Sequence, residues 1–282
     1  MRADRPSSTA TLIAAATVLL ARDPRLRHLV PAGAAEICAR CLTRPWLMAT
    51  QMRWLVRAAE RATIPGLMLH FMLRKRWIEA AVRGALGRGC RQVVVLGAGF
   101  DTLAARLAPQ FPAVRFLEID HPATQAVKRA AVERRNLPQV PSFVAADLAR
   151  TSLGDALAAS PYDRNRASVF VIEGLLMYLT PDEMAALFAA IGELQPRAGE
   201  LVFTVMEPRR DGRLAFHNAT WVERALLALW KEPFKSAVSR DALPGRLGGW
   251  GLRLRELADL AAAHPDLVLA RGEIIVHAAR SP

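Results

Sequence analysis

The arrangement of apolar and polar positions changes once along the chain, near residue 91. From Thr9 to about Gly89, apolar residues recur at helical spacing, with breaks where prolines and glycines gather, at residues 23–24, 31–33, 44–45 and 65–66. After residue 91, short apolar runs alternate with helical segments in units of roughly 25 to 30 residues. This alternation predicts a parallel sheet with crossover helices.

The expected strands cover residues 91–97, 114–120, 142–147, 168–174 and 200–208, and two shorter strands at 250–257 and 272–279 suit the far edge of the sheet. Helices are expected at about 102–107 and 122–135, and Thr180 opens a third in a capping box with Glu183. The fold class is α/β, with a doubly wound, mostly parallel sheet. We expect residues 1–89 to form a helical cap and substrate lid, and residues 90–282 to form the sheet domain with a helical insertion at about 208–244.

Composition and charge narrow the class of protein. With 282 residues, 52% of them hydrophobic, the chain can bury a globular core. The net charge of +12 is spread over the whole length without a basic block, so no nucleic-acid partner is expected. The odd cysteine count, Cys38, Cys41 and Cys90, argues against a disulfide framework and for a reducing, cytoplasmic compartment. No metal is expected, because Cys38 and Cys41 lack a second pair of ligands.

The N-terminus imitates a secretory signal, because Arg2 and Arg5 precede the apolar run of residues 9–21. That run is too short to span a membrane, and no clear small-residue cleavage site follows it. We therefore expect an amphipathic helix capped by Ser8 or Thr9, and no membrane partner.

A glycine turn follows the first expected strand. Gly97, Ala98 and Gly99 bring bare backbone to the carboxyl edge of the sheet, where open sheets of this type bind ligands, and a nucleotide-like cofactor is implied. The dinucleotide fingerprint requires a third glycine where this chain has Thr102. This difference, with the absence of a Tyr-x3-Lys pair, disfavours an NAD-dependent reductase.

Acidic residues follow the same edge from strand to strand. Asp120 ends the second strand and suits a ribose, Asp147 ends the third and suits an adenine amino group, and Glu173 ends the fourth. Carboxylates gathered at one edge repel one another unless a ligand with donors lies between them. An acid-lined site without a phosphate cradle suits S-adenosylmethionine, which carries a sulfonium cation, better than it suits NAD.

Four stretches together resemble the leucine carboxyl methyltransferase family, including its bacterial branch that O-methylates polyketide-type carboxylates. They are VVVLGAGFDTLAARL, FLEIDHP with Lys128 after it, VAADL and IEGLLMYLTPDE, and their order and spacing hold from about Arg74 to Leu194. The resemblance implies a Rossmann-like class I methyltransferase fold with S-adenosyl-L-methionine as cofactor. Bacterial relatives often have arginine where this chain has Leu103, and the arginine of the first helix is replaced around Ala16 and Thr17. The eukaryotic enzymes use an arginine to hold the target carboxylate where this chain has Ala149, so a peptide C-terminus is not the expected substrate.

The resemblance also implies roles for single residues. On the cofactor side they are Gly97, Ala98 and Gly99 under the amino-acid part, Asp120 at the ribose, Asp147 and Leu148 at the adenine, Glu173 at the amino group and Arg74 at the carboxylate. Arg76 competes with Arg74 for the last role. Tyr178 is implied on the substrate side.

The nature of the acceptor decides which residues take part in the chemistry. A carboxylate is already ionised at pH 7 and needs only a cation or donor to orient it. The groups available for this are Arg74, Arg76, Arg150 and Tyr178. A phenol or alcohol needs a base, and the candidates are His70, His121 and His217. We expect the carboxylate route. The catalytic candidates over both routes are Tyr178 and Arg150, and His217 as the base of a hydroxyl acceptor.

Aromatic and methionine side chains favour an acceptor with an apolar body. They are Trp46, Met48, Met52, Trp54, Met68, Phe71, Met72 and Trp77 in the first part, and Phe216, Trp221 and Trp230 in the insertion. Core packing is the simpler explanation for any single one of them. We expect a polyketide-like or aromatic acid as substrate. Three alternatives stay open: a methyltransferase acting on a hydroxyl group, a non-catalytic ligand-binding protein on the same fold, and an RNA methyltransferase.

Overall fold

Seven strands form one sheet in the computed structural model, which describes residues 6–42, 53–195, 199–220 and 234–280. The strands are β1 (Gln92–Leu96), β2 (Arg115–Asp120), β3 (Ser142–Ala145), β4 (Ser168–Ile172), β5 (Gly199–Met206), β6 (Leu252–Ala258) and β7 (Glu273–Arg280). Their order is β3-β2-β1-β4-β5-β7-β6, and β7 runs antiparallel to both of its neighbours. The predicted strands and the doubly wound, mostly parallel α/β fold are confirmed.

Strand β1 shows why the strands have apolar residues at consecutive positions. Val93 and Val95 belong to the core on one face of the sheet, and Val94 and Leu96 belong to the core on the other. All four side chains are at most 1% exposed. A strand covered on both faces needs apolar residues at every position, so it shows no alternation with polar residues.

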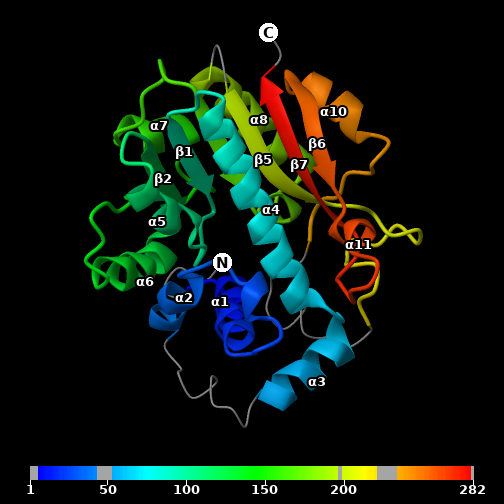
Figure 1. Cartoon of the computed structure of the whole chain (residues 1–282). Coiled ribbons are helices and arrows are strands. Elements are labelled where there is room, and N and C mark those ends of the chain that lie inside the picture. Colours follow the sequence, from blue (N-terminus) through cyan, green and yellow to red (C-terminus); the bar gives the residue numbers. More distant parts are fainter. Residues whose placement is uncertain (1–5, 43–52, 196–198, 221–233, 281–282) are drawn as a thin grey trace.

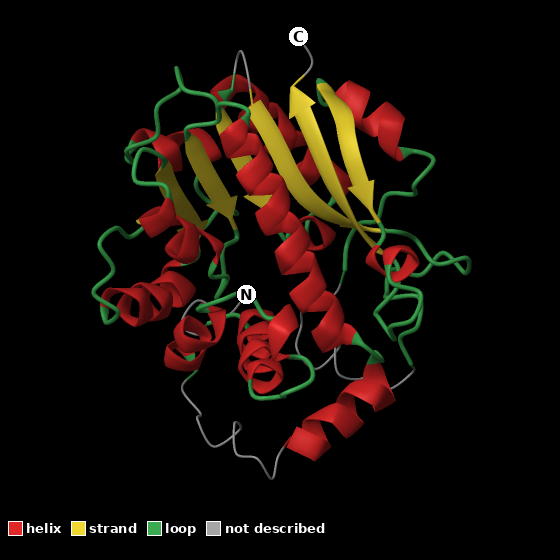
Figure 2. Cartoon of the chain, viewed as in Figure 1, coloured by secondary structure: helices red, strands yellow, loops and turns green. Residues whose placement is uncertain are grey.

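Helices cover both faces of the sheet and its carboxyl edge (Figures 1 and 2). The α-helices are α1 (Ser8–Ala21), α2 (Ala34–Cys41), α3 (Arg53–Thr63), α4 (Leu67–Gly87), α5 (Leu103–Leu107), α6 (Pro122–Glu133), α7 (Leu153–Ala158), α8 (Pro181–Leu194), α10 (Leu243–Gly249) and α11 (Leu260–Ala263). The 3-10 helices are η1 (Arg27–Leu29), η4 (Ala108–Gln110) and η5 (Leu176–Tyr178). Helices α4, α5 and α11 pack on one face, and α7, α8 and α10 pack on the other.

The N-terminal helices lie where the parallel strands end. In Figure 1 the arrows of β1 and β2 point down toward α1 and α2, and α3 lies further out on the same side. Helix α4 contributes to both regions, since its Met72 packs with α1 while its Val82 packs against the sheet. The division of the chain into a cap and a sheet domain at residue 89 stays a prediction.

Helix α1 differs from the predicted amphipathic helix in two respects. Its N-cap is Ser7 and not Ser8 or Thr9, because the Ser7 hydroxyl accepts a hydrogen bond from the N–H of Ala10 at 3.2 Å. No residue of α1 from Ala10 onward is exposed, since residues of α2, α4 and α6 pack with it. A helix enclosed on all sides needs apolar residues on all sides, which explains its likeness to a secretory signal.

The structure separates the N-terminal helices at three of the predicted breaks, residues 23–24, 31–33 and 65–66. The fourth break, at 44–45, lies outside the described residues, as does the centre of the predicted helical insertion, 221–233. The described flanks of that insertion, 208–220 and 234–242, contain no helix. Within the described ranges, none of the helices has the length and apolar character needed to cross a membrane.

Replacing Thr180 tests the capping box of α8, which the structure contains. Thr180 Oγ1 accepts from the N–H of Glu183 at 3.2 Å, and Glu183 Oε2 accepts from the N–H of Thr180 at 2.7 Å. Thr180→Ala should lower the free energy of unfolding by about 1 kcal/mol, because an N-terminal N–H of the helix loses its partner. Urea unfolding measures the change. Thr180→Ser keeps the hydroxyl and should retain most of the stability, so equal losses in both variants would contradict the prediction.

Candidate functional site

A glycine turn connects the end of β1 with Asp120 at the end of β2. Gly97 and Gly99 have φ angles of 62° and 48°, in the left-handed region that favours glycine. The Asp120 carboxylate accepts hydrogen bonds from the N–H groups of Gly99 and His121, both at 2.6 Å. An added Cβ at Gly99 would lie 3.2 Å from the Cβ of Ala10. The turn, the carboxylate and α1 therefore form one close-packed unit.

Two further predicted cofactor contacts follow β3. The strand ends at Ala145, so Asp147 lies two residues beyond it, and its Oδ1 accepts the N–H of Ala149 at 3.1 Å. Leu148 packs against the core on the α8 face of the sheet. Both side chains are half-buried and lie past the carboxyl end of β3, beside the strand that ends in Asp120.

Five buried charges at the same edge form what we call the ion network. Its members are Arg74 and Lys75 on α4, Asp101 after the glycine turn, Glu173 after β4 and Glu273 at the start of β7. Arg74 lies 2.7 Å from Glu173 and 2.8 Å from Glu273. Lys75 lies 2.7 Å from Asp101 and 3.1 Å from Glu173. Each side chain is at most 10% exposed, and such buried charges are tolerated because each one has partners of opposite sign.

The carboxylate of Glu273 is held from two sides. Both oxygens accept hydrogen bonds from Nη1 of Arg74, at 2.8 and 2.9 Å, and Oε2 lies 2.6 Å from Nε2 of His70. Burial alone would raise the pKa of Glu273, but the Arg74 guanidinium and the His70 imidazole outweigh it and bring the pKa to about 2. Glu273 is therefore ionised at neutral pH and fixes the Arg74 guanidinium beside Glu173.

Internal cations pair with some of the acids at this edge. Lys75 pairs with both Asp101 and Glu173, and Lys128 of α6 lies 2.5 Å from Glu118 with both side chains 1% exposed. Burial raises the pKa of Glu118 to about 7, against the lowering effect of Lys128. Of the predicted site acids, Glu173 receives a cation from α4, whereas Asp120 and Asp147 accept backbone N–H groups, so the expectation that a ligand lies between these carboxylates stays a prediction.

The predicted catalytic residues lie in three different surroundings. Tyr178 ends η5 and lies edge to face against Phe234, with ring centroids 5.7 Å apart. It joins an apolar cluster that contains Phe216, the neighbour of His217 in the sequence. Arg150 is exposed in the turn after Asp147, and its side chain makes no hydrogen bond or ion pair with the rest of the described chain.

The remaining candidates for contact with the acceptor have internal partners. His121 caps α6 through Nδ1, which accepts a backbone N–H of that helix at 3.3 Å. His217 is exposed, and its Nε2 lies 3.2 Å from a backbone carbonyl oxygen. Arg76 donates to the carbonyl oxygen of His28 at 2.9 Å, so Arg74 is the arginine of this pair that enters the ion network.

Sequence reasoning missed three members of the ion network, namely Lys75, Asp101 and Glu273. Two of them had a positional signal, since Lys75 follows Arg74 directly and Asp101 stands just after the glycine turn. Glu273 had none, because it lies 199 residues from Arg74 and reaches it only through the pairing of β7 beside β5.

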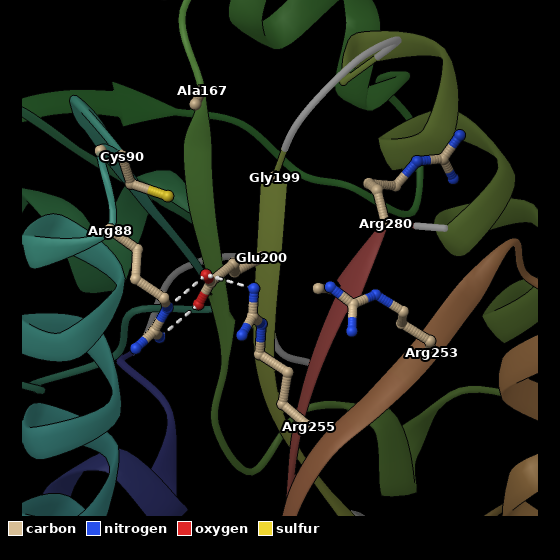
Figure 3. Close-up of a pocket in the computed structure, with 10 residues that line it drawn as sticks. Arg88, Cys90, Ala167, Gly199, Glu200, Arg253, Arg255 and Arg280 are labelled. Atoms are coloured by element: carbon tan, nitrogen blue, oxygen red, sulfur yellow. Dashed lines mark hydrogen bonds and ion pairs between the residues drawn. The ribbon is translucent and has the colours of Figure 1, made fainter. Parts of the chain in front are cut away.

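A hollow of about 610 Å³ lies elsewhere, and Figure 3 shows the residues that line it. They come from the segments before β1 and β4, from the start of β5, and from β6 and the end of β7. The glycine turn, Asp120 and Glu173 lie at the opposite ends of the same parallel strands. This hollow is therefore no part of the candidate site.

Comparison with known proteins identifies the family to which these features correspond. The model of the leucine carboxyl methyltransferase family matches residues 8–192. A relative from Mycobacterium leprae is 37% identical over 151 residues, covering 52% of this chain and 49% of its own length. A relative from Mycolicibacterium smegmatis is 29% identical, covering 93% of this chain and 88% of its own length. Both carry the provisional name S-adenosyl-L-methionine-dependent methyltransferase, and this chain spans about half the length of the first.

Solved structures share the fold at low sequence identity. A provisionally named methyltransferase from Thermobifida fusca has a TM-score of 0.56 at 17% identity, covering 99% of this chain and 96% of that one. The 1,6-didemethyltoxoflavin-N1-methyltransferase of Burkholderia thailandensis, solved with its namesake ligand and S-adenosylhomocysteine, has a TM-score of 0.52 at 18% identity. It covers 74% of this chain and 79% of its own. The class I methyltransferase fold is confirmed.

Glu273→Gln should destabilise the protein in a pH-dependent way. The pKa of Glu273 falls from an ordinary 4.5 to about 2 in the folded chain. Between these values the unfolded state binds more protons than the folded state, so the carboxylate stabilises the fold fully above about pH 5 and loses this effect as the pH falls toward 2. The shift corresponds to roughly 3 kcal/mol.

Chemical unfolding of wild type and Glu273→Gln at pH 7 and at pH 3 measures this effect. The difference in unfolding free energy between the two proteins should be large at pH 7 and clearly smaller at pH 3. Glu256→Gln removes an exposed carboxylate from the neighbouring strand and serves as the matched control. A difference for Glu273→Gln that does not change with pH would contradict the assigned ionisation.

Proposed function

Because the chain belongs to the leucine carboxyl methyltransferase family, we propose that this S-adenosyl-L-methionine-dependent methyltransferase transfers the methyl group to a carboxylate of a small molecule with an apolar body. The acceptor is a polyketide-like or aromatic acid, and the product is its methyl ester. The name of the family supports a carboxyl acceptor. The observation that carries the proposal is the set of contacts that the three candidate histidines make, because a hydroxyl acceptor would require one of them as a base.

Two of these histidines are committed to other contacts. His70 is 1% exposed and bonded to Glu273, and His121 uses a ring nitrogen to cap α6. His217 alone of the three is exposed, and its Nδ1 accepts no hydrogen bond from the described part of the chain. A hydroxyl acceptor would depend on His217 as base. A carboxylate acceptor needs no base, because it is ionised at pH 7.

The residues of the carboxyl edge fit S-adenosyl-L-methionine, which supplies an electrophilic methyl group on its sulfonium when bound. Its amino-acid part carries an ammonium and a carboxylate, and Glu173 and Arg74 offer the opposite charge to each. Each oxygen of Asp120 accepts one backbone hydrogen bond and so keeps lone pairs for the ribose hydroxyls. We assign Asp147 and Leu148 to the adenine.

Other members of the ion network keep the binding pair oriented. Arg74 and Glu173 lie 2.7 Å apart and form an ion pair with each other. When the ligand binds, this pair is exchanged for two, one between Arg74 and the ligand carboxylate and one between Glu173 and the ligand ammonium. Glu273 holds the Arg74 guanidinium from the side of β7, and Lys75 holds Glu173 from α4. These side chains do not have to be ordered at the moment of binding, which lowers the entropic cost of recognition.

An apolar cluster beyond β4 and β5 suits the body of the acceptor. It contains Ile64, Met177, Met206 and Phe216, with Tyr178 at its margin. Aromatic and methionine side chains adapt to flat or irregular apolar ligands. Met68, Phe71 and Met72, which the sequence placed in the same group, instead pack in the core between α1, α2 and α4.

Methyl transfer from a sulfonium is an in-line displacement, so the task of the chain is to align the acceptor oxygen and exclude water. We assign Tyr178 to the acceptor side, as the candidate that orients the carboxylate. Arg150 follows Asp147 on the surface and is the second candidate, as a cation. Helix α1, packed on the glycine turn, shields the cofactor side from solvent.

Asp120→Ala should weaken S-adenosyl-L-methionine binding by at least about tenfold, because two hydrogen bonds from ribose to a charged group are lost. Isothermal titration calorimetry measures the affinity. Asp182→Ala removes an exposed carboxylate in the first turn of α8 and should leave the affinity unchanged. Unchanged affinity in Asp120→Ala, with an intact melting temperature, would remove Asp120 from the site.

Transfer of a labelled methyl group into a panel of aromatic and polyketide acids and phenols tests the acceptor class. Mild alkali releases methanol from a methyl ester and leaves an ether intact. We expect label to appear as methanol, and His217→Ala to retain activity. Label that survives alkali, together with loss of activity in His217→Ala, would replace the carboxylate by a hydroxyl acceptor.

A further inference from the structure

The hollow of Figure 3 carries an excess of positive charge at the amino edge of the sheet. Its walls hold Arg88, Arg253, Arg255 and Arg280 and a single acid, Glu200. The other residues that line it are small, namely glycines, alanines and one cysteine, which leaves about 610 Å³ of space between the guanidinium groups. Arg280 turns its guanidinium away, toward Trp250, so Arg88, Arg253 and Arg255 face one glutamate, a difference of two charges.

Glu200 already has its full set of partners. Its carboxylate accepts hydrogen bonds from Arg88 at 2.8 and 2.7 Å, and Oε2 lies 2.6 Å from Nε2 of His277. Arg255 reaches it only at 3.5 Å. Burial alone would raise the pKa of Glu200, but Arg88 and His277 outweigh it and lower the pKa to about 2. Glu200, the single acid of the hollow, is thus ionised at neutral pH, and its carboxylate is hydrogen-bonded to Arg88.

Arg253 and Arg280 differ from Arg88 and Arg255, which both pair with Glu200. No carboxylate in the described ranges pairs with Arg253 or Arg280, and Arg280 donates instead to the carbonyl oxygen of Trp250 at 3.4 Å. Figure 3 shows the Arg255 guanidinium turned toward Glu200, and the Arg253 side chain extending toward Arg255 from the other side. Like charges placed side by side repel, and an anion bound between them removes that repulsion.

We propose that this hollow binds an oxyanion of the phosphate class that carries several negative charges, held by Arg88, Arg253 and Arg255. Guanidinium groups present paired N–H donors that match two oxygens of a phosphate at once. Arg88 is fixed by its double hydrogen bond to Glu200, so one wall of the site is formed before the ligand binds. The site lies at the opposite end of the parallel strands from the glycine turn and takes no part in methyl transfer.

Calorimetric titration of the full chain with pyrophosphate, at constant ionic strength, tests the proposal. Saturable binding of one pyrophosphate per chain is expected. Arg253→Gln and Arg255→Gln should each weaken it about tenfold, as expected for the loss of one strong charge-assisted contact. Arg246→Gln removes the same charge from the exposed surface of α10, outside the hollow, and should leave the affinity unchanged.

Three results would overturn the proposal. They are binding that does not saturate, equal weakening in Arg246→Gln, and failure to bind pyrophosphate while a single-stranded RNA oligonucleotide binds. The first two would mean that diffuse surface charge attracts the anion, and the third that the arginines serve a nucleic-acid surface. Arg253 and Arg255 are exposed, so the variants should keep the melting temperature of wild type without ligand. Pyrophosphate should then raise the melting temperature of wild type and not that of the double variant.

Discussion

The contact between Arg74 and Glu273 is the interaction on which the organisation of the carboxyl edge depends. It joins the long helix α4 to the last strand of the sheet across 199 residues of sequence, with almost no exposure to solvent. Two buried charges of this kind are stable only together, because removing one leaves the other unpaired in a medium that solvates it poorly. The strand β7 must therefore be in place before Arg74 can take its position beside Glu173. The candidate site exists only in the complete fold.

The same argument explains why the cofactor side of the edge uses residues from so many segments. Gly99 touches α1, Asp120 binds the glycine turn, and Glu173 receives Arg74 and Lys75 from α4. No single segment has the full set of donors and acceptors, so the geometry is determined by packing between the N-terminal helices and the sheet. A site built this way is preorganised, since each charged group is already held by a neighbour that does not contact the ligand.

The sequence was informative where local chemistry decides the structure and uninformative where topology does. Continuous apolar runs predicted the strands, and the glycines and Asp120 marked the edge, because strand ends and left-handed turns leave local signatures. The capping box at Thr180 was found for the same reason. The position of Glu273 depends on an antiparallel strand inserted between β5 and β6, and no local pattern reports that pairing. The pairing of Lys75 with Glu173 and of Lys128 with Glu118 was not predicted, because these cations lie on α4 and α6 and the strand pattern does not report which helix faces the edge.

Helix α4 connects the two edges of the sheet, which raises the question of coupling between them. It presents Arg74 to Glu273 at the carboxyl edge, and Arg88, the residue that caps its C-terminus, to Glu200 at the amino edge. Coupling between distant sites requires an element with two arrangements that both ligands bias. Both glutamates have a pKa near 2 and stay ionised, so α4 is anchored at both edges at neutral pH. Coupling through α4 would therefore require a second arrangement of both ion pairs.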